Sequence, residues 1–187
     1  EVPAGLTTQF VVGAAGESDR EILTASDWLY RNLSLRRAYY SALRPVRGTP
    51  LAGVSAPPPA REHRLYQSDW LLRFYGFSFS ELPFETASGN LRLDLDPKLA
   101  WAAAHPDRFP VEINRAAREE LLRVPGLGPV SAERILARRR QGKIASLDAL
   151  KALRVPAHRA RNYLTLDGRF FPAKEKEEPP EQLLLDL

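Results

Sequence analysis

The sequence predicts an α/β segment followed by an all-α segment. Near the start, an apolar, β-branched run at 7–12 ends at a glycine and is followed by an amphipathic stretch and a second apolar run. In the second half, turns containing glycine or proline separate helical stretches, and the tetrapeptide LRVP occurs at 122–125 and again at 153–156. The chain has 187 residues, which is enough for one domain or two small ones with a real core.

The first part predicts a strand, a helix and a second strand. Residues 7–12 are typical of a buried strand, and GAAGES at 13–18 is typical of a turn. Ser18 and Glu21 have the spacing of a capping box, so a helix is expected to begin there. A second strand is expected at 38–46, and this order of elements implies a parallel pair. The helix is expected to bury Ile22, Ala25, Leu29 and Leu33, and to be closed by the positive charges of Arg36 and Arg37.

A proline- and glycine-containing loop at 47–60 leads to a predicted helix at 61–75. This helix is dense in aromatic residues, which lie in a core more often than they face a ligand. We therefore expect its aromatic side chains in the core and its polar side chains on a solvated face. The aromatic residues are Tyr66, Trp70, Phe74 and Tyr75, and the polar ones are Arg61, Glu62, His63, Arg64, Gln67 and Asp69.

Residues 80–110 are expected to connect the two parts. Leu91, Leu93 and Leu95 alternate with polar residues, which favours a short extended segment. Asp96 is placed to cap a short helix that has Pro97 at its first position.

Residues 111–169 predict two similar helix pairs packed together. Asn114 is expected to cap a helix that ends near Arg123, and a second helix follows at 130–140 and ends at Gly142. The two LRVP segments lie 31 residues apart (122 and 153), which indicates a second pair of the same kind. That second pair has Ala157, His158 and Arg159 where glycines are expected, so it is interpreted as a scaffold.

Positive charge is concentrated in this part. The whole chain has 27 Lys+Arg and 23 Asp+Glu, a net charge of +4. Residues 111–169 hold 13 Lys+Arg against 6 Asp+Glu, a net of +7, and the remainder has 14 against 17, a net of −3. A basic segment joined to an acidic remainder indicates a nucleic-acid partner, and the alternative is an ordinary solvated helical surface.

Composition excludes several kinds of site. The chain has no Cys, which excludes a disulfide framework, a thiolate zinc site, an iron–sulfur cluster held by this chain and a Cys nucleophile. Its three His are scattered, so no metal site is expected. The chain contains no run of 18 apolar residues, so no membrane span is predicted, and a cytoplasmic location is expected. The absence of Met, together with a start at Glu1, predicts a piece of a longer protein.

The turn at 124–129 (VPGLGP) has features that suit the binding of an anion. Gly126 and Gly128 permit a sharp turn and leave backbone amides bare at the start of the next helix, where the helix dipole favours an anion. The segment LLRVPGLGPVSAERIL at 121–136 resembles the helix-hairpin-helix DNA-binding motif, which implies contact with the backbone of double-stranded DNA. The alternative is a hairpin used only for packing or protein contact. The expected DNA-binding residues are Gly126, Leu127, Gly128, Val130, Arg134, Arg138 and Arg139.

The surrounding sequence VEINRAAREELLRVPGLGP, continued by GKIASLDALKAL, resembles the double helix-hairpin-helix modules of DNA uptake and repair proteins. DNA glycosylases with such hairpins use an Asp about twenty residues beyond the turn, and Asp148 lies at that distance from Gly128. The context SLDAL at 146–150 is that of a helix start, so capping explains Asp148 more simply than base excision does.

The first part resembles a known enzyme family. TTQFVVGAAGESDREIL at 7–23 resembles a late barrel strand and loop of radical S-adenosylmethionine (SAM) enzymes. Together with REHRLYQSDWLLRFYGF at 61–77 and the hairpin module, the chain up to Phe171 is similar to the C-terminal half of radical-SAM proteins of DNA modification or repair that are linked to a uracil-DNA-glycosylase-like partner.

This resemblance implies the C-terminal βα units of a partial (β/α) barrel at 1–79, a connector at 80–110, a helix-hairpin-helix domain at 111–169 and a disordered acidic tail at 170–187. It places Gly13, Gly16 and Glu17 near bound SAM, although a simple strand-to-helix turn is the alternative. The family's cluster motif C-x-x-x-C-x-x-C is absent, so the [4Fe–4S] cluster and SAM are implied only for a full-length protein. No catalytic residue is assigned. The alternative is a noncatalytic helix-hairpin-helix DNA-binding protein whose α/β domain has another purpose.

Overall fold

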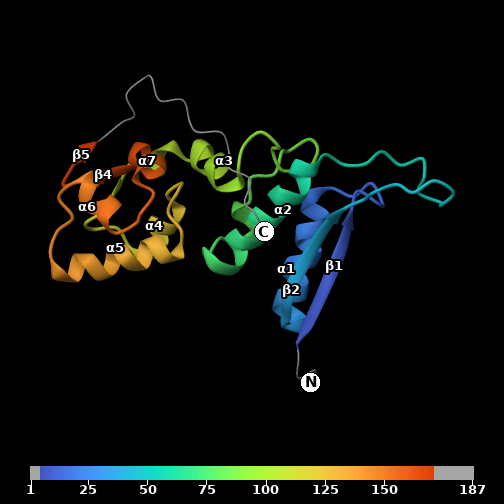
Figure 1. Cartoon of the computed structure of the whole chain (residues 1–187), viewed down its shortest axis with the longest axis horizontal. Coiled ribbons are helices and arrows are strands. Elements are labelled where there is room, and N and C mark those ends of the chain that lie inside the picture. Colours follow the sequence, from blue (N-terminus) through green and yellow to red (C-terminus); the bar gives the residue numbers. More distant parts are fainter. Residues whose placement is uncertain (1–4, 171–187) are drawn as a thin grey trace. The chain divides into compact units, whose positions relative to one another are not determined.

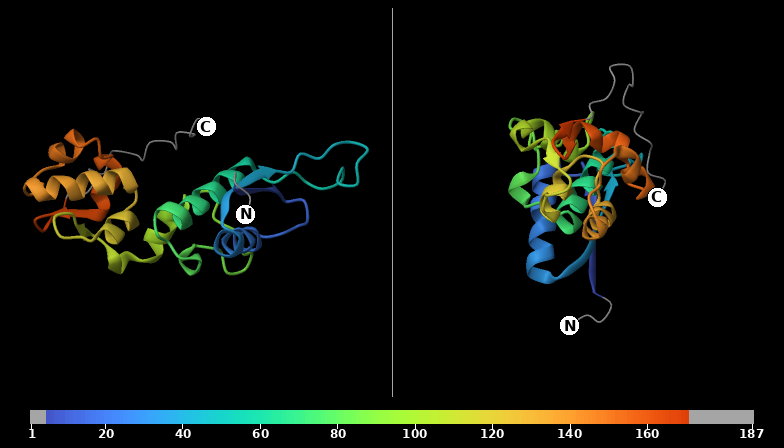
Figure 2. Two further views of the ribbon diagram at one scale, coloured as in Figure 1. Left: turned by 90° about the horizontal axis from the view of Figure 1, so that it is seen from below. Right: turned by 90° about the vertical axis from the view of Figure 1, so that its left-hand side faces the viewer.

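The computed structural model describes residues 5–170, so the tail expected at 170–187 lies outside the described residues except for Phe170. The chain divides into two compact units, Glu1–Pro106 (unit 1) and Asp107–Leu187 (unit 2). Figure 1 shows the order of their helices and strands, and Figure 2 shows the same elements from two further directions.

Unit 1 is built on a parallel pair of strands. Strand β1 (Leu6–Val12) pairs with β2 (Leu35–Ala42), and α1 (Asp19–Leu33) connects them, as predicted. The expectation that β1 is buried is wrong, because only Val12 is buried and Val11 is 51% exposed. Within the described residues this sheet has two strands, and no further strand pairs with the outer edge of β1.

Helix α1 begins at the predicted capping box. The Ser18 hydroxyl accepts a hydrogen bond from the Glu21 amide, and the Glu21 carboxylate accepts one from the Ser18 amide. The buried face differs from the predicted one, since it contains Ile22, Leu23 and Ser26 while Leu33 is 49% exposed. Arg36 and Arg37 lie in β2 and do not close the helix, which ends at Leu33 before a left-handed residue, Ser34.

Helix α2 (Pro59–Phe74) contradicts the expectation for its aromatic and polar faces. Trp70 is 50% exposed and Phe74 is 44% exposed, whereas Arg64, Ser68 and Asp69 are buried. The helix buries Leu65 and Leu71, and its Asp69 and Glu62 carboxylates accept hydrogen bonds from α1 and β2, so apolar and polar contacts together set its orientation.

Asp69 is the centre of this polar contact. Its carboxylate accepts hydrogen bonds from the Tyr30 hydroxyl at 2.6 Å, the Tyr40 hydroxyl at 3.2 Å and Nε of Arg73 at 2.8 Å. Burial raises the pKa of both tyrosines, and the Asp69 charge raises it further, so both phenols stay protonated donors. A buried carboxylate is thereby supplied with the partners that burial requires.

The rest of unit 1 packs beside α2. The short 3-10 turn η1 (Phe79–Glu81) is followed by an isolated bridge between Phe84 and Leu91, and α3 (Pro97–Ala104) packs on α2. Asp96 caps α3 as predicted, accepting a hydrogen bond from the Leu99 amide at 2.9 Å. Trp101 is buried against Phe77, with ring centroids 5.5 Å apart.

Unit 2 combines short helices with a small sheet, so the expectation of an all-α domain is wrong. Strand β3 (Val111–Glu112) pairs with β4 (Leu164–Leu166) in parallel, and β4 pairs with β5 (Arg169–Phe170) antiparallel. These pairings were missed because each strand has only two or three residues, too few to show an alternating pattern. The elements are η2 (Pro106–Arg108), β3 (Val111–Glu112), α4 (Arg118–Arg123), α5 (Pro129–Gln141), α6 (Leu147–Ala152), α7 (Ala157–Ala160), η3 (Arg161–Tyr163), β4 (Leu164–Leu166) and β5 (Arg169–Phe170).

Asn114 has a different role from the predicted one. Helix α4 begins at Arg118, and Asn114 lies before it. The Asn114 side chain instead donates a hydrogen bond to the Ile144 carbonyl at 3.0 Å and accepts one from the Ile144 amide at 2.9 Å. This residue therefore joins the segment before α4 to the segment before α6.

Candidate nucleic-acid interface

Helices α4 and α5 form the predicted hairpin around a tightly packed seam. Ala132 of α5 is completely buried. The apolar residues of the seam are equally inaccessible, and they are Leu121, Val124, Leu127 and Ile135. Because these side chains face inward, they are not available to a ligand.

The two glycines of the turn have different backbone conformations. Gly126 has φ +82°, a left-handed conformation that favours glycine, whereas Gly128 has φ −105° and ψ 177°, which any residue adopts. A Cβ at Gly126 would lie 2.7 Å from Cβ of Arg159 and 3.4 Å from the Ala160 amide nitrogen. Gly126 is thus needed for the turn and for the close approach of α7.

Several amides at the start of α5 are available to an anion. The Leu127 amide is used within the turn, donating to the Val124 carbonyl at 3.1 Å, and the Leu127 side chain is buried. Pro129 has no N–H, and within residues 5–170 the amides of Gly128, Val130 and Ser131 donate to no protein acceptor. These three amides belong to the helix N-terminus, where the dipole also favours negative charge.

The predicted arginines of α5 are bonded within unit 2. Arg134 Nη1 lies 3.4 Å from each of the carbonyl oxygens of Leu153 and Arg154. Arg138 donates to the Gly142 carbonyl at 3.1 Å, and Arg139 donates to the Ala116 carbonyl at 2.6 Å. Arg138 therefore closes the end of its own helix, and Arg139 ties α5 to the segment before α4.

The second hairpin, α6 and α7, forms its turn without glycine. Arg154 adopts φ +54°, its amide donates to the Lys151 carbonyl at 2.8 Å, and the Val155 amide donates to the Leu150 carbonyl at 3.1 Å. This is the hydrogen-bond pattern of a Schellman motif, in which the left-handed residue is usually glycine.

Asp148 behaves as a residue of a helix start. Ser146 is the cap of α6, accepting a hydrogen bond from the Ala149 amide at 3.1 Å, and Asp148 is exposed in the first turn with Lys151 at 3.1 Å. Asp148 therefore does not cap the helix, and its negative charge in the first turn is favoured by the helix dipole.

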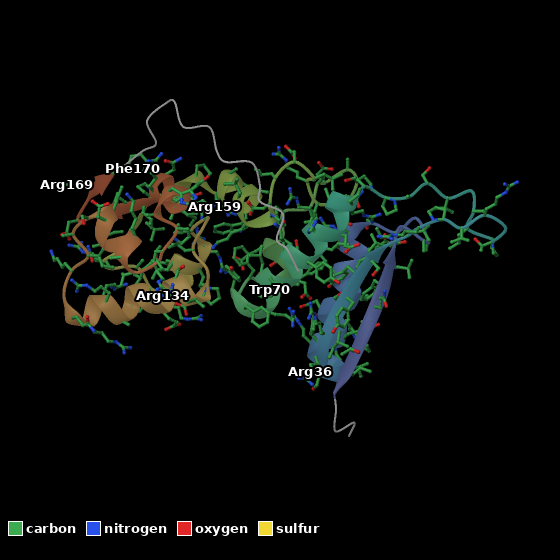
Figure 3. The ribbon with its side chains drawn as sticks, viewed as in Figure 1. Arg36, Trp70, Arg134, Arg159, Arg169 and Phe170 are labelled. Carbon is green, nitrogen blue, oxygen red and sulfur yellow. The ribbon has the colours of Figure 1, made fainter. Side chains whose placement is uncertain are left out.

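Arg159, which packs against the Gly126 turn, was not among the residues predicted for the interface. The repeat could have indicated it, since the offset of 31 residues aligns Arg159 with Gly128 (128 + 31 = 159). Arg134 on α5 and Arg159 on α7 are both labelled in Figure 3.

In unit 1, the loop with the expected cofactor residues is closed by its own hydrogen bonds. Gly13 and Gly16 have φ +85° and +74°, and the Glu17 carboxylate accepts hydrogen bonds from the amides of Gly13 and Ala15. Burial raises the pKa of Glu17, but these hydrogen bonds and the charge of Arg61 outweigh it, so the pKa lies below its ordinary value of 4.5. Arg61 also donates to the Glu17 carbonyl and to Asp19, the latter at 2.6 Å.

Two kinds of feature are absent from residues 5–170. These residues contain no group of three or more His, Asp or Glu placed to hold a metal ion. They also contain no helix with the length and apolar character needed to span a bilayer.

Comparison with known proteins identifies the hairpin alone. Residues 108–155 match the helix-hairpin-helix motif family, a range that runs from before α4 to the end of the second LRV sequence. No curated protein and no solved structure matches the chain. The match suggests nucleic-acid binding by unit 2.

Proposed function

We propose that unit 2 binds the phosphate backbone of double-stranded DNA through the α4–α5 hairpin, with little dependence on sequence. The observation that carries the proposal is the group of three amides, at Gly128, Val130 and Ser131, that have no protein acceptor within the described residues. They lie in the segment that matches the helix-hairpin-helix motif. Phosphate oxygens are suitable acceptors for amides at a helix N-terminus.

The charge of unit 2 supports the same partner. Residues 107–170 contain 14 Lys+Arg and 7 Asp+Glu, a net of +7. Such a surface attracts a polyanion, and contacts to phosphates carry no base information. The binding is therefore expected to be weakly selective and strongly salt-dependent.

The test is fluorescence anisotropy with two labelled duplexes of unrelated sequence, titrated with the full chain at several salt concentrations. We expect similar affinities for both duplexes and a steep loss between about 50 and 200 mM salt, with a slope near −0.9 for each phosphate contacted. Absence of binding, affinity that ignores salt, or strong preference for one duplex would contradict the proposal.

A substitution at Gly128 tests the amides directly. Its φ and ψ are those of an ordinary N-cap residue, so the side chain in Gly128→Asp can accept a hydrogen bond from the Val130 or Ser131 amide. This variant is expected to keep or slightly raise the stability of α5 and to lower DNA affinity at least tenfold. Gly128→Asn is the matched control, because it fills the cap without adding charge and isolates the loss of the amides. If both variants bind DNA like the parent, the hairpin is not the contact.

We also propose, as a finer assignment, that unit 1 belongs to a larger parallel sheet of a radical-SAM protein of DNA modification or repair, with a uracil-DNA-glycosylase-like partner. The parallel β1–α1–β2 unit supports this, since parallel strands occur mostly in larger α/β sheets and this sheet has two strands within residues 5–170. The competing assignment is a noncatalytic DNA-binding protein whose unit 1 has another purpose.

The residues present do not fit the cofactors of that family. There is no Cys to ligate a [4Fe–4S] cluster, and the Glu17 carboxylate is engaged by amides of its own loop, so no reaction step is derived. Reading the complete gene for a C-x-x-x-C-x-x-C motif decides between the two assignments. Reconstitution of this chain with iron and sulfide is expected to leave it colourless, and a reproducible cluster absorbance would contradict the conclusion that this chain does not hold the cluster.

A further inference from the structure

Arg159 occupies a distinctive place in the second hairpin. The repeat aligns it with Gly128, the residue at which α5 is capped in the first hairpin. In the aligned sequence, the second hairpin therefore carries a cationic side chain in place of Gly128, and in the structure Arg159 lies inside α7, whose cap is Pro156.

The packing of unit 2 places this arginine beside the first hairpin's turn. The Cβ position of Gly126 lies 2.7 Å from Cβ of Arg159 and 3.4 Å from the backbone of α7. Gly126 is two residues from Gly128, a span of at most about 7 Å along the chain. The base of the Arg159 side chain therefore lies beside the turn that leads into the start of α5.

Arg159 also differs from the arginines of α5 in having an uncommitted side chain. It is exposed, and within the described residues its guanidinium makes no hydrogen bond or ion pair. Arg134, Arg138 and Arg139 all donate to backbone carbonyls. A guanidinium keeps its charge at any physiological pH and can bind two phosphate oxygens at once.

We propose that Arg159 binds the same DNA phosphate as the amides at the start of α5. Both hairpins then contribute to a single phosphate site, in which the first supplies the amides and the second supplies the cation. The second hairpin does not bind a separate phosphate through amides of its own. This inference rests on the proposed function and names a residue outside the segment that matches the motif family.

The test compares Arg159→Ala with Arg140→Ala in the anisotropy assay. Arg140 is also exposed and has no partner within the described residues, but it lies eleven residues beyond Pro129, about 16 Å along α5. We expect Arg159→Ala to weaken binding about five- to tenfold and to lower the salt slope by about 0.9, one phosphate contact. Arg140→Ala is expected to weaken it no more than about twofold, and Arg159→Lys, which keeps the charge but not the two-point contact, is expected to bind with an affinity between those of the parent and Arg159→Ala.

A double-variant cycle tests whether the phosphate is shared. Gly128→Asn combined with Arg159→Ala is expected to lose less affinity than the product of the two single losses, because both remove contacts to one phosphate. Strictly multiplicative losses would overturn the shared site. Equal losses in Arg159→Ala and Arg140→Ala, or parent-like binding by a folded Arg159→Ala, would overturn the role of Arg159 while leaving the proposed function standing. Failure of the parent chain to bind DNA would overturn the proposed function itself, and this inference with it.

Discussion

Replacing Gly126 with alanine is expected to destabilise unit 2 strongly and unit 1 not at all. Two effects add at this position. The left-handed φ of +82° costs an L-residue about 1–2 kcal/mol, because its Cβ approaches the carbonyl oxygen. The new Cβ would also overlap Cβ of Arg159 at 2.7 Å, and overpacking of this kind costs about 1–3 kcal/mol. The sum is a loss of about 2–5 kcal/mol in the free energy of unfolding.

The arrangement of tryptophans allows the two units to be followed separately. All three Trp, at 28, 70 and 101, lie in unit 1, so intrinsic Trp fluorescence reports unit 1, and far-UV circular dichroism reports both units. In a domain of this size 1 kcal/mol corresponds to about 4–8 °C in Tm. The dichroism transition of unit 2 should therefore fall by at least about 8 °C in Gly126→Ala, while the fluorescence transition stays in place.

Gly128→Ala is the matched control, since its φ of −105° suits any residue and only a modest capping effect, below about 1 kcal/mol, is expected. The reasoning is refuted if Gly126→Ala unfolds within about 0.5 kcal/mol of the parent, or if the two alanine variants are equally destabilised.

Three further changes are expected to have defined effects. Asp69→Asn removes the charge that pairs with Arg73 in the buried network and should lower the stability of unit 1 by about 2–4 kcal/mol in urea unfolding followed by Trp fluorescence. Asp27→Asn, which alters the more exposed pair with Arg31, should change the stability of unit 1 by less than about 0.5 kcal/mol. Equal losses in Asp69→Asn and Asp27→Asn would show that the buried network does not stabilise unit 1 more than a surface ion pair does. Arg154→Gly should raise the Tm of unit 2, because glycine adopts a φ of +54° without the strain, about 0.5–1 kcal/mol, that arginine has there. A fall in Tm would show that the Arg154 side chain stabilises the turn. The pKa of Glu17 is depressed in the folded chain, so its contribution to stability is present above the unfolded pKa and is lost as the pH falls through the folded pKa. Unit 1 should therefore lose stability below about pH 5, and Glu17→Gln should reduce that loss; an unchanged pH profile would contradict the loop contacts.

The sequence predicted best where a few neighbouring residues determine the structure. The capping box of Ser18 and Glu21, the cap of α3 at Asp96 and the end of α5 at Gly142 all depend on hydrogen bonds within one turn, and all three are present. The hairpin seam was also predictable, because its apolar residues recur at helical spacing.

Prediction failed where the deciding partner is distant in the sequence. Helix α2 turns its polar side inward because Asp69 meets Tyr30 and Tyr40, 39 and 29 residues away, and no local pattern reveals such partners. Asn114 is bonded to Ile144, 30 residues away, rather than capping the helix that follows it. The distinction between Gly126 and Gly128 likewise depends on the approach of α7 from the second hairpin.

Among residues 5–170 no strand pairs with the outer edge of β1, and this edge bears on how the molecule behaves when concentrated. A strand edge without a neighbour presents a row of amide and carbonyl groups that another chain can pair with. Natural edges are usually blunted by lysine, proline or a bulge, but LTTQFVV at 6–12 contains no charged residue and no proline. Self-association through this edge is therefore a route to aggregation for unit 1, and a lysine in place of the exposed Gln9 adds the missing repulsion between copies.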